Sequence, residues 1–331
     1  MTPVESTGRH LVPVHPDRNL GMELVRATEA AAIRAWRLVG KGDKTPADGA
    51  AVDAMRAFLS TVSFDGLVVI GEGEKDEAPM LFNGERVGDG HGPRCDIAVD
   101  PIDGTSLTAA GRLDALSMIA VADRGSMFDP SAVFYMEKPV AGPEARGVID
   151  IRRSIGENIR ALASAKGKPI GDMRIAVLDR PRHADLIQAI RATGAGTELL
   201  LDGDVAGAVN AAREDSRVDM CIGIGGTPEG VISACAVKAL NGFIQGVLHP
   251  TSDLERARAE SQGLDVDAVL EGSDLVRSDN VYFVATGVTS GSLVRGVERV
   301  GNRIRTESIV LRSQSQTVRR VTGDHSAAHW A

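Results

Sequence analysis

The amino-acid sequence predicts an α/β protein with two sub-domains. Its 331 residues, of which 43% are hydrophobic and 25% charged, have an ordinary globular composition and suffice for one large domain or two medium ones. From about residue 142 onward, strand-like apolar runs alternate with segments of helical periodicity, a pattern typical of a mostly parallel sheet covered by helices. We therefore expect sub-domains over 18–141 and 142–323, between a flexible lead-in at 1–17 and a flexible tail at 324–331.

Two helices are expected first. Apolar residues recur over 21–39 at spacings of three and four residues or their multiples, and Gly40 supplies a stop. A second helix is expected over 45–62, because a threonine cap is followed by Pro46 at the first helical position.

Strands are expected where short apolar runs end in turn residues. In the first sub-domain the predicted strands are 67–71, 96–100 and 115–123. In the second, strands at 174–179, 197–202 and 218–224 are each followed by a helical pattern, and strands at 242–248, 281–287, 305–313 and 317–323 complete the same sheet.

Composition argues against several classes of function. The net charge of −8 disfavours broad binding to nucleic acid or to an anionic membrane. No apolar run reaches the roughly 18 to 20 residues of a membrane span, and the first residues do not resemble a signal peptide, so we expect a cytoplasmic protein. Cys95, Cys221 and Cys235 lack the spacing of a disulfide framework or a zinc site, and we expect them to be buried.

The segment DIAVDPIDGTSL (96–107) carries the strongest chemical signal. A hydrophobic strand ends at Asp100, Asp103 is expected to point back beside it, and Gly104 and Thr105 are expected to begin a helix that suits a phosphate. Paired carboxylates beside such a helix suit Mg²⁺ or Mn²⁺ chemistry on a phosphate ester. A solvated acidic turn would be the better interpretation of an isolated DxxD, but the further acidic clusters favour a site.

The segment GEGEKDEAPM (71–80) also follows an apolar strand directly. Its acids at 72, 74, 76 and 77 repel one another unless cations neutralise them. Such a run is often only a solvated loop. Here its position at the carboxyl end of a strand, where open α/β sheets bind ligands, favours a site.

Two acids are expected in the first turns of helices. Asp48 lies near the start of the second helix, where stabilisation of the helix dipole is the better interpretation if it is taken alone. Glu229 lies in GIGGTPEGVISA (223–234), a glycine turn after a strand that is also common as punctuation. This turn lacks the lysine of a Walker A loop.

Basic and polar candidates for a second phosphate are Tyr135 and the stretch 180–183, with Lys138 and Lys44 as further possibilities. Arginine forks match phosphate geometry in pairs. The stretch 202–204 follows a strand and could hold sugar hydroxyls. Helix capping or surface solvation is the alternative for each of these groups.

A set of segments together resembles the class II bacterial fructose-1,6-bisphosphatases, in order and in spacing, from about Asp17 to Gly323. They are TPADGAAV, GEGEKDEAPM, DPIDGT, YMEK, LDRPRH, DGDVAGAV, GGTPEG and SDNVYFVATG. DPIDGT alone is shared with the wider lithium-sensitive metal phosphatases, which include inositol monophosphatases and nucleotide 3′-phosphatases. The resemblance implies a layered αβαβα sugar-phosphatase fold with mixed sheets.

The resemblance also implies a set of site residues. Metal ligands of the family fall on Asp48, Glu72, Asp100, Asp103 and Glu229. Substrate contacts fall on Asp103, Gly104, Thr105, Tyr135, Arg180, Pro181, Arg182, Asp202, Gly203, Asp204 and Gly226. Members of the family often have glutamate where Asp103 stands and lysine where Arg180 stands, and both changes keep the charge.

The implied reaction is hydrolysis of fructose-1,6-bisphosphate to fructose-6-phosphate and phosphate, a step of gluconeogenesis, and some relatives also accept sedoheptulose-1,7-bisphosphate. Two or three Mg²⁺ or Mn²⁺ ions would bind the 1-phosphate and lower the pKa of a coordinated water. We expect Thr105 to orient this water, Glu74 or Asp76 to act as the base, and Arg180, Arg182 and Tyr135 to hold the distal phosphate. We also expect inhibition by Li⁺ and a homo-oligomer, dimer or tetramer.

Two other functions remain open. Another lithium-sensitive phosphatase would act on an inositol phosphate or a nucleotide 3′-phosphate, and a panel of substrates distinguishes it. A catalytically idle binding protein would have lost one of the acids or Thr105, and none is lost.

Overall fold

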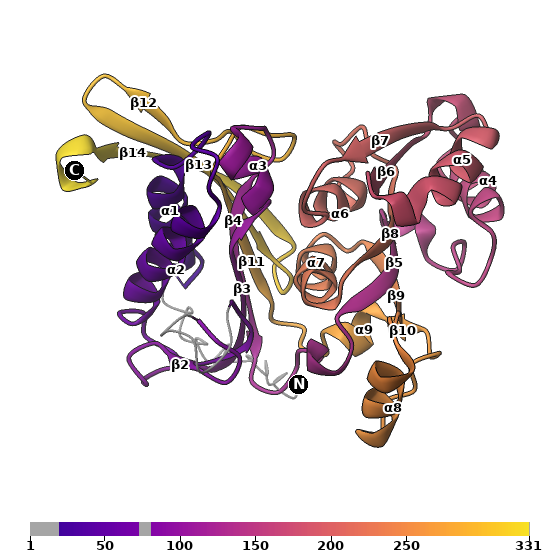
Figure 1. Ribbon diagram of the computed structural model, residues 1–331, viewed down its shortest axis with the longest axis horizontal. Coiled ribbons are helices and arrows are strands. Elements are labelled where there is room, and N and C mark those ends of the chain that lie inside the picture. Colours follow the sequence, from indigo (N-terminus) through magenta and orange to yellow (C-terminus); the bar gives the residue numbers. More distant parts are fainter. Residues whose placement is uncertain (1–19, 73–80, 331) are drawn as a thin grey trace, which may run out of the picture.

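The computed structural model describes residues 20–72 and 81–330, in which helices and two mixed β-sheets alternate in layers (Figure 1). The outer helices on one side are α1 (Leu20–Trp36) and α2 (Thr45–Leu59). The first sheet follows, then a middle layer of α6 (Val205–Ala212) and α7 (Thr227–Ala239). The second sheet is covered on its far side by α4 (Ile155–Ala165) and α5 (Ala184–Ala192). This is the expected αβαβα layering.

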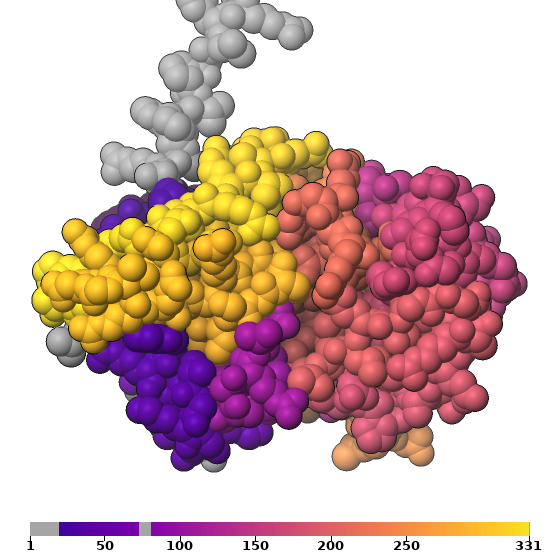
Figure 2. All heavy atoms as spheres, turned by 90° about the horizontal axis from the view of Figure 1, so that it is seen from above, coloured from indigo at the N-terminus to yellow at the C-terminus, as the bar shows by residue number. Residues whose placement is uncertain are grey.

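The first sheet has eight strands in the order β12-β13-β11-β4-β3-β1-β2, with β14 paired to β13. Their bounds are β1 (Asp65–Ile70), β2 (Arg86–Val87), β3 (Arg94–Asp103), β4 (Leu116–Asp123), β11 (Tyr282–Gly287), β12 (Glu298–Val300), β13 (Arg303–Arg312) and β14 (Thr317–Ser326). Only the β1–β3 pair is parallel among the described strands of this sheet. Figure 2 accordingly shows the amino-terminal (indigo) and carboxy-terminal (yellow) parts of the chain on the same side of the molecule.

The second sheet has six strands in the order β10-β9-β5-β8-β6-β7. Their bounds are β5 (Tyr135–Ala141), β6 (Arg174–Leu178), β7 (Gly196–Leu200), β8 (Met220–Gly226), β9 (Phe243–Leu248) and β10 (Leu270–Glu271). β6 runs parallel to β7 and β8, whereas β5 is antiparallel to β8 and β9.

Short helices complete the described part of the chain. They are α3 (Thr105–Ala110), α8 (Asp253–Ser261), α9 (Gly272–Leu275), η1 (Pro130–Ala132), η2 (Pro143–Ala145), η3 (Ile170–Asp172), η4 (Pro181–His183) and η5 (Ala327–Trp330).

The predicted elements are present, but their assignment to sheets differs from the expectation. The strands expected at 281–287, 305–313 and 317–323 belong to the first sheet, and β5, which the sequence did not predict, belongs to the second. The division between the sheets therefore does not coincide with the expected boundary at residue 142. A hydrophobic pattern shows that a strand is buried, but it does not show which neighbours the strand pairs with.

The carboxy-terminal segment was expected to fray from Asp324, and it does not. β14 continues to Ser326, which pairs with Arg303, and η5 follows. His325 and Trp330 lie edge to face, with ring centroids 6.0 Å apart, and Trp330 packs against the core between the first sheet and α1. Polar residues thus continue an edge strand because their side chains find partners across the sheet.

The middle layer consists mostly of small, buried residues. Every residue of α6 is buried, and α7 is buried around most of its circumference. The core cluster on these helices includes Ala98 and Met118 of the first sheet together with Met136 and Val140 of the second. Alanine and valine let two sheets pack closely on one layer of helices.

The expectations for the cysteines and for membrane-spanning helices can be checked on the described residues. The three cysteines are buried as expected, and burial raises the pKa of Cys235 to about 12, so that it stays a thiol. Over 20–72 and 81–330, no helix combines the length and the apolar character that a membrane crossing requires.

Candidate active site

A cavity of about 330 Å³ lies where loops from both sheets meet. Its lining residues are Glu72, Asp100, Ile102, Asp103, Gly104, Thr105, Tyr135, Leu178, Arg180, Arg182, Asp202, Gly203, Asp204, Gly225, Gly226 and Glu229. Residues that were predicted from distant parts of the sequence thus share one cavity. Of the site residues that the family resemblance implies within the described ranges, only Asp48 and Pro181 do not line it.

The end of β3 delivers two of the acids. Residues three apart on a regular strand point to opposite faces. The register between β3 and β4 shifts between Asp100 and Asp103, and such an irregularity reverses the alternation. Both aspartates therefore line the same cavity. Gly104 then adopts a φ of +84° as the cap of α3, a conformation that favours glycine, and Thr105 is the first residue of that helix.

Three further acids come from other elements. Glu72 follows β1, and its backbone N–H donates to the carbonyl of Leu81 at 2.8 Å. Asp48 and Glu229 lie in the first turns of α2 and α7, as the sequence predicted. A Cβ on Gly226 would lie only 1.7 Å from Oε2 of Glu229, so a side chain at position 226 would displace this carboxylate.

These carboxylates raise one another's pKa values. Burial, and then the neighbouring Asp48 and Glu229, raises the pKa of Glu72 to about 7. Burial and then Asp103 raise the pKa of Asp100 well above its usual range. Burial and then Asp204 raise the pKa values of Asp103 and Glu229. Such a cluster needs either protons or cations to neutralise it.

The donor set fits hard divalent cations. Oδ1 of Asp48 and Oε2 of Glu229 are buried without a hydrogen-bond partner among the described residues, and carboxylate oxygens are the ligands that Mg²⁺ and Mn²⁺ prefer. As they stand, however, no three acidic, histidine or cysteine side chains within 20–72 and 81–330 form a ready ligand group. The fit therefore rests on the unpaired oxygens and the electrostatics.

The arginines lie on the side of the second sheet. Nη2 of Arg180 contacts Oδ1 of Asp202 at 2.7 Å, so Asp202 holds this guanidinium. Arg182 donates from Nε and Nη2 to the carbonyl of Ile224, at 3.1 and 2.8 Å. Its guanidinium also lies 5.2 Å from the centroid of the Tyr135 ring. Pro181 begins the 3₁₀ turn η4 that carries Arg182.

Lys138 has a role that the sequence did not show. It is 3% exposed, and its Nζ lies 2.8 Å from Oδ2 of Asp204 and donates to the carbonyl of Gly226 at 3.2 Å. It therefore pairs with an acid of the cavity wall. In the sequence, Lys138 is marked only by its place in the segment YMEK. The structure shows that this segment begins the strand β5. Lys44 is exposed and does not line the cavity.

Two of the predicted catalytic residues cannot be placed. Glu74 and Asp76 lie within 73–80, outside the described residues. Of the segment GEGEKDEAPM, only Gly71 and Glu72 are therefore located.

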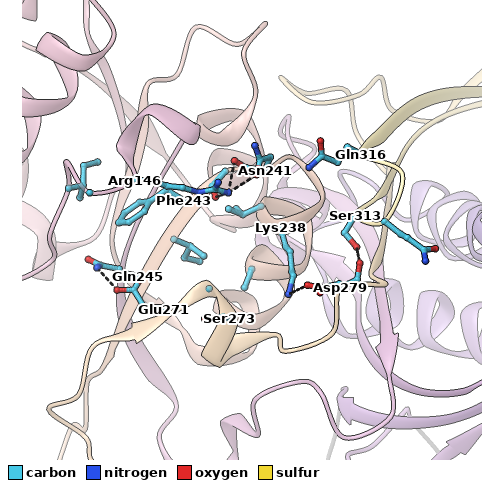
Figure 3. A pocket seen from close by; sticks show the side chains of 18 residues that line it. Arg146, Lys238, Asn241, Phe243, Gln245, Glu271, Ser273, Asp279, Ser313 and Gln316 are labelled. Carbon is cyan, nitrogen blue, oxygen red and sulfur yellow. Dashed lines mark hydrogen bonds and ion pairs between the residues drawn. The ribbon is translucent and has the colours of Figure 1, made fainter.

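A larger cavity of about 720 Å³ opens between α7, β9, α9 and the turn between β13 and β14 (Figure 3). Its charged groups are already bound to neighbours: Lys238 contacts Asp279 at 3.1 Å, and Arg146 donates to Oδ1 of Asn241 at 2.7 Å. None of the predicted site residues lines it. The smaller cavity, in which unpaired acids meet arginines, is therefore the candidate active site.

Known proteins match this chain along most of its length. The sequence model of the family described as "Bacterial fructose-1,6-bisphosphatase, glpX-encoded" matches residues 18–325. The chain is 44% identical over 321 residues to "Fructose-1,6-bisphosphatase 1 class 2" of Escherichia coli strain K12, a match covering 93% of this chain and 95% of that protein. The same values hold for "Fructose-1,6-bisphosphatase class 2" of Escherichia coli O6:H1 and of Shigella flexneri.

Proposed function

Because the chain belongs to the glpX-encoded family of bacterial fructose-1,6-bisphosphatases, we propose that it is a phosphatase that converts fructose-1,6-bisphosphate and water to fructose-6-phosphate and phosphate. The observation that supports this most directly is the cavity with an acidic group on the side of the first sheet and arginines on the side of the second. A sugar with a phosphate at each end matches these two kinds of group.

The acidic side would hold the cofactor. Asp48, Glu72, Asp100, Asp103 and Glu229 are the proposed ligands of two or three Mg²⁺ or Mn²⁺ ions, supported by the unpaired buried oxygens of Asp48 and Glu229. When bound, the ions supply a Lewis acid for the phosphoryl oxygens and a hydroxide nucleophile at neutral pH. Their positive charge also explains how a chain of net charge −8 accepts an anionic substrate.

The residues beside this group would handle the 1-phosphate and its proton. Thr105 begins α3 two residues after Asp103, where its hydroxyl can hydrogen-bond the attacking water and hold it in line with the leaving oxygen. Glu74 or Asp76 is the proposed base. Its assignment rests on the family resemblance, because both lie outside the described residues.

The arginine side would hold the distal phosphate. Arg182 keeps Nη1 unbonded among the described residues, and the ring of Tyr135 lies beside it. Arg180 is oriented by Asp202. Asp204 lines the cavity and is held by the buried Lys138, and its proposed role is to accept from a sugar hydroxyl. Binding energy from the distal phosphate would then align the 1-phosphate for attack.

Phosphate release from fructose-1,6-bisphosphate is the first test. We expect EDTA to abolish it and Mg²⁺ or Mn²⁺ to restore it, since Lys138, a cation that acts on Asp103 and Glu229, is already paired with Asp204. Undiminished turnover in metal-free buffer would exclude the metal-dependent mechanism. Inhibition by Li⁺, placement in the lithium-sensitive superfamily, a cytoplasmic location and a homo-oligomeric state remain predictions.

A substrate panel at fixed Mn²⁺ tests the substrate class. It should contain fructose-1,6-bisphosphate, sedoheptulose-1,7-bisphosphate, an inositol monophosphate and a nucleotide 3′-phosphate. We expect the sugar bisphosphates to be preferred, because the arginines give the second phosphate a binding group. Preference for the inositol or nucleotide substrate would support the alternative phosphatase function.

A further inference from the structure

His183 fills a gap between two strands of the second sheet. β6 and β8 pair only at Ile175 with Met220 and at Ala176 with Cys221, although both strands continue toward the cavity. Where they separate, the ring of His183 lies between them. Its Nδ1 is 2.8 Å from the carbonyl oxygen of Leu178 on β6, and its Nε2 is 2.8 Å from the backbone N of Ile224 on β8.

These contacts determine the protonation state of the ring. The carbonyl of Leu178 can only accept, so Nδ1 carries the proton; the N–H of Ile224 can only donate, so Nε2 is the acceptor. The ring is therefore the neutral Nδ1–H tautomer. It is 1% exposed, and burial is the main cause that lowers its pKa. The charged groups that face it are Arg180 and Arg182 of its own turn and Asp204 at the start of α6.

The backbone of Ile224 connects this ring to the arginine proposed to bind the distal phosphate. Its N–H donates to His183, and its carbonyl accepts both hydrogen bonds from Arg182. Gly223 makes room for the arrangement: it has a φ of +146°, and a Cβ there would lie 3.0 Å from Cε1 and Nε2 of His183. The position of the Arg182 guanidinium therefore depends on a residue whose backbone N–H the imidazole holds.

We propose that His183 is a positioning residue for the distal phosphate, because its ring holds the backbone N–H of Ile224 and the carbonyl of the same residue holds the guanidinium of Arg182. This inference rests on the proposed function, since it assigns Arg182 to the distal phosphate. In this proposal His183 does not contact the substrate. Substitution of His183 should lower the affinity only for ligands that carry a distal phosphate, and only while Arg182 is present.

The test uses His183→Phe, which keeps a planar ring and removes both hydrogen bonds, and His183→Gln, whose carbonyl can still accept from Ile224. Fructose-6-phosphate carries only the distal phosphate, so calorimetry with Mg²⁺ present measures its affinity without catalysis. We expect His183→Phe to raise the Kd of fructose-6-phosphate and the KM of fructose-1,6-bisphosphate by about three- to tenfold, the size of one lost neutral hydrogen bond. His183→Gln should recover part of this loss. Constants for fructose-1-phosphate should change less than twofold.

A double-variant cycle separates positioning from general damage. In an Arg182→Ala background, His183→Phe should change the Kd of fructose-6-phosphate by less than twofold, because the residue through which it acts is gone. His91→Phe, at an exposed histidine that does not line the cavity, is the matched control and should match wild type. An equal loss with and without Arg182, or an equal loss on fructose-1-phosphate, would overturn the proposal. If His183→Phe does not fold, His183→Gln enters the same cycle.

The pH dependence supplies a readout that a purely packing role would not change. Protonation of Nε2 removes the acceptor for Ile224, so the affinity of wild type for fructose-6-phosphate should fall more steeply than that of His183→Phe as the pH decreases through the lowered pKa. The phosphate's own protonation affects both proteins alike. Parallel profiles would overturn the proposal. Wild type that binds fructose-6-phosphate but does not hydrolyse the bisphosphate would instead contradict the proposed function.

Discussion

Thr105 is the residue at which the proposed reaction can be tested most finely. It lines the cavity as the first residue of α3, two positions after Asp103. Thr105→Ser keeps the hydroxyl and should retain much of the activity. Thr105→Ala should lower kcat on the order of a hundredfold or more, the range of general acid–base assistance. Steady-state kinetics on fructose-1,6-bisphosphate measures this, and two variants with wild-type kcat would reduce Thr105 to a structural helix start.

Arg182 should govern selectivity between substrates. Arg182→Ala removes a charge-assisted bond to the distal phosphate, a contribution of roughly 1.5 to 3 kcal/mol. We therefore expect kcat/KM for fructose-1,6-bisphosphate to fall about ten- to a hundredfold. Slow hydrolysis of fructose-1-phosphate should change little. Equal losses on both substrates would place Arg182 in the reaction centre or in the stability of the fold.

At this scale the sequence predicted residues at the ends of strands and in the first turns of helices. Asp100, Asp103 and Glu229 could be found because such positions converge at the edge of a sheet. The partners of Lys138 and His183 could not, because a polar residue buried within β5 or between β6 and β8 gives no periodic signal. Which acid or backbone group such a buried residue contacts depends on the order of the strands in the sheet.

β14 extends beyond the strand that the sequence predicts at 317–323. Its last residues pair with β13, and His325 lies 3.0 Å from Thr306 and 3.5 Å from Glu29 of α1. Truncation after Gly323 should therefore lower the free energy of unfolding by about 1 to 3 kcal/mol, because strand pairing and the packing of Trp330 are both lost. Thermal unfolding measures the loss.

A matched variant identifies the cause of that loss. Asp324→Ala removes only an exposed ion pair with Arg305, at 2.8 Å, which is worth at most about 1 kcal/mol. It should therefore unfold close to wild type. A truncated protein as stable as wild type would mean that the segment contributes nothing in solution.

The elements themselves were largely predictable, and their neighbours were not. α1, α2, α5 and α7 follow helical periodicity or caps, and β1, β3, β4, β6 and β8 follow apolar runs that end in turns. β5 contains Glu137, Lys138 and Pro139 and lacks a strand pattern, yet it joins β8 to β9. Pairing between segments more than a hundred residues apart, as between β4 and β11, is a property of the assembled sheet.

The stability of the whole molecule should depend on pH, because several carboxylates lie close together in the cavity. Burial, and then Asp48 and Glu229, raises the pKa of Glu72 to about 7, so the folded metal-free protein holds this proton more tightly than the unfolded chain. The resulting stability is fully present below the unfolded pKa and is lost as the pH rises through the folded one. Metal-free protein should therefore lose thermal stability between about pH 5 and pH 8.

Differential scanning fluorimetry with EDTA or Mg²⁺ measures this effect. The metal should raise the melting temperature more at pH 8 than at pH 5.5, because it binds the deprotonated acids. Glu72→Gln should flatten the dependence of melting temperature on pH in metal-free protein, since it removes a carboxyl group whose pKa is raised. A wild-type profile no steeper than that of Glu72→Gln would contradict the assignment.

The buried helices α6 and α7 have a consequence for the range of sugars that such a cavity can accept. They separate the sheet that supplies Asp100 and Asp103 from the sheet that supplies Arg180 and Arg182. The reach between the two phosphates of a substrate must therefore match a thickness that is set by alanine and valine side chains. A six-carbon and a seven-carbon bisphosphate differ in that reach. Substrate length could consequently diverge between relatives through volume changes inside these helices, while every residue that touches the sugar stays the same.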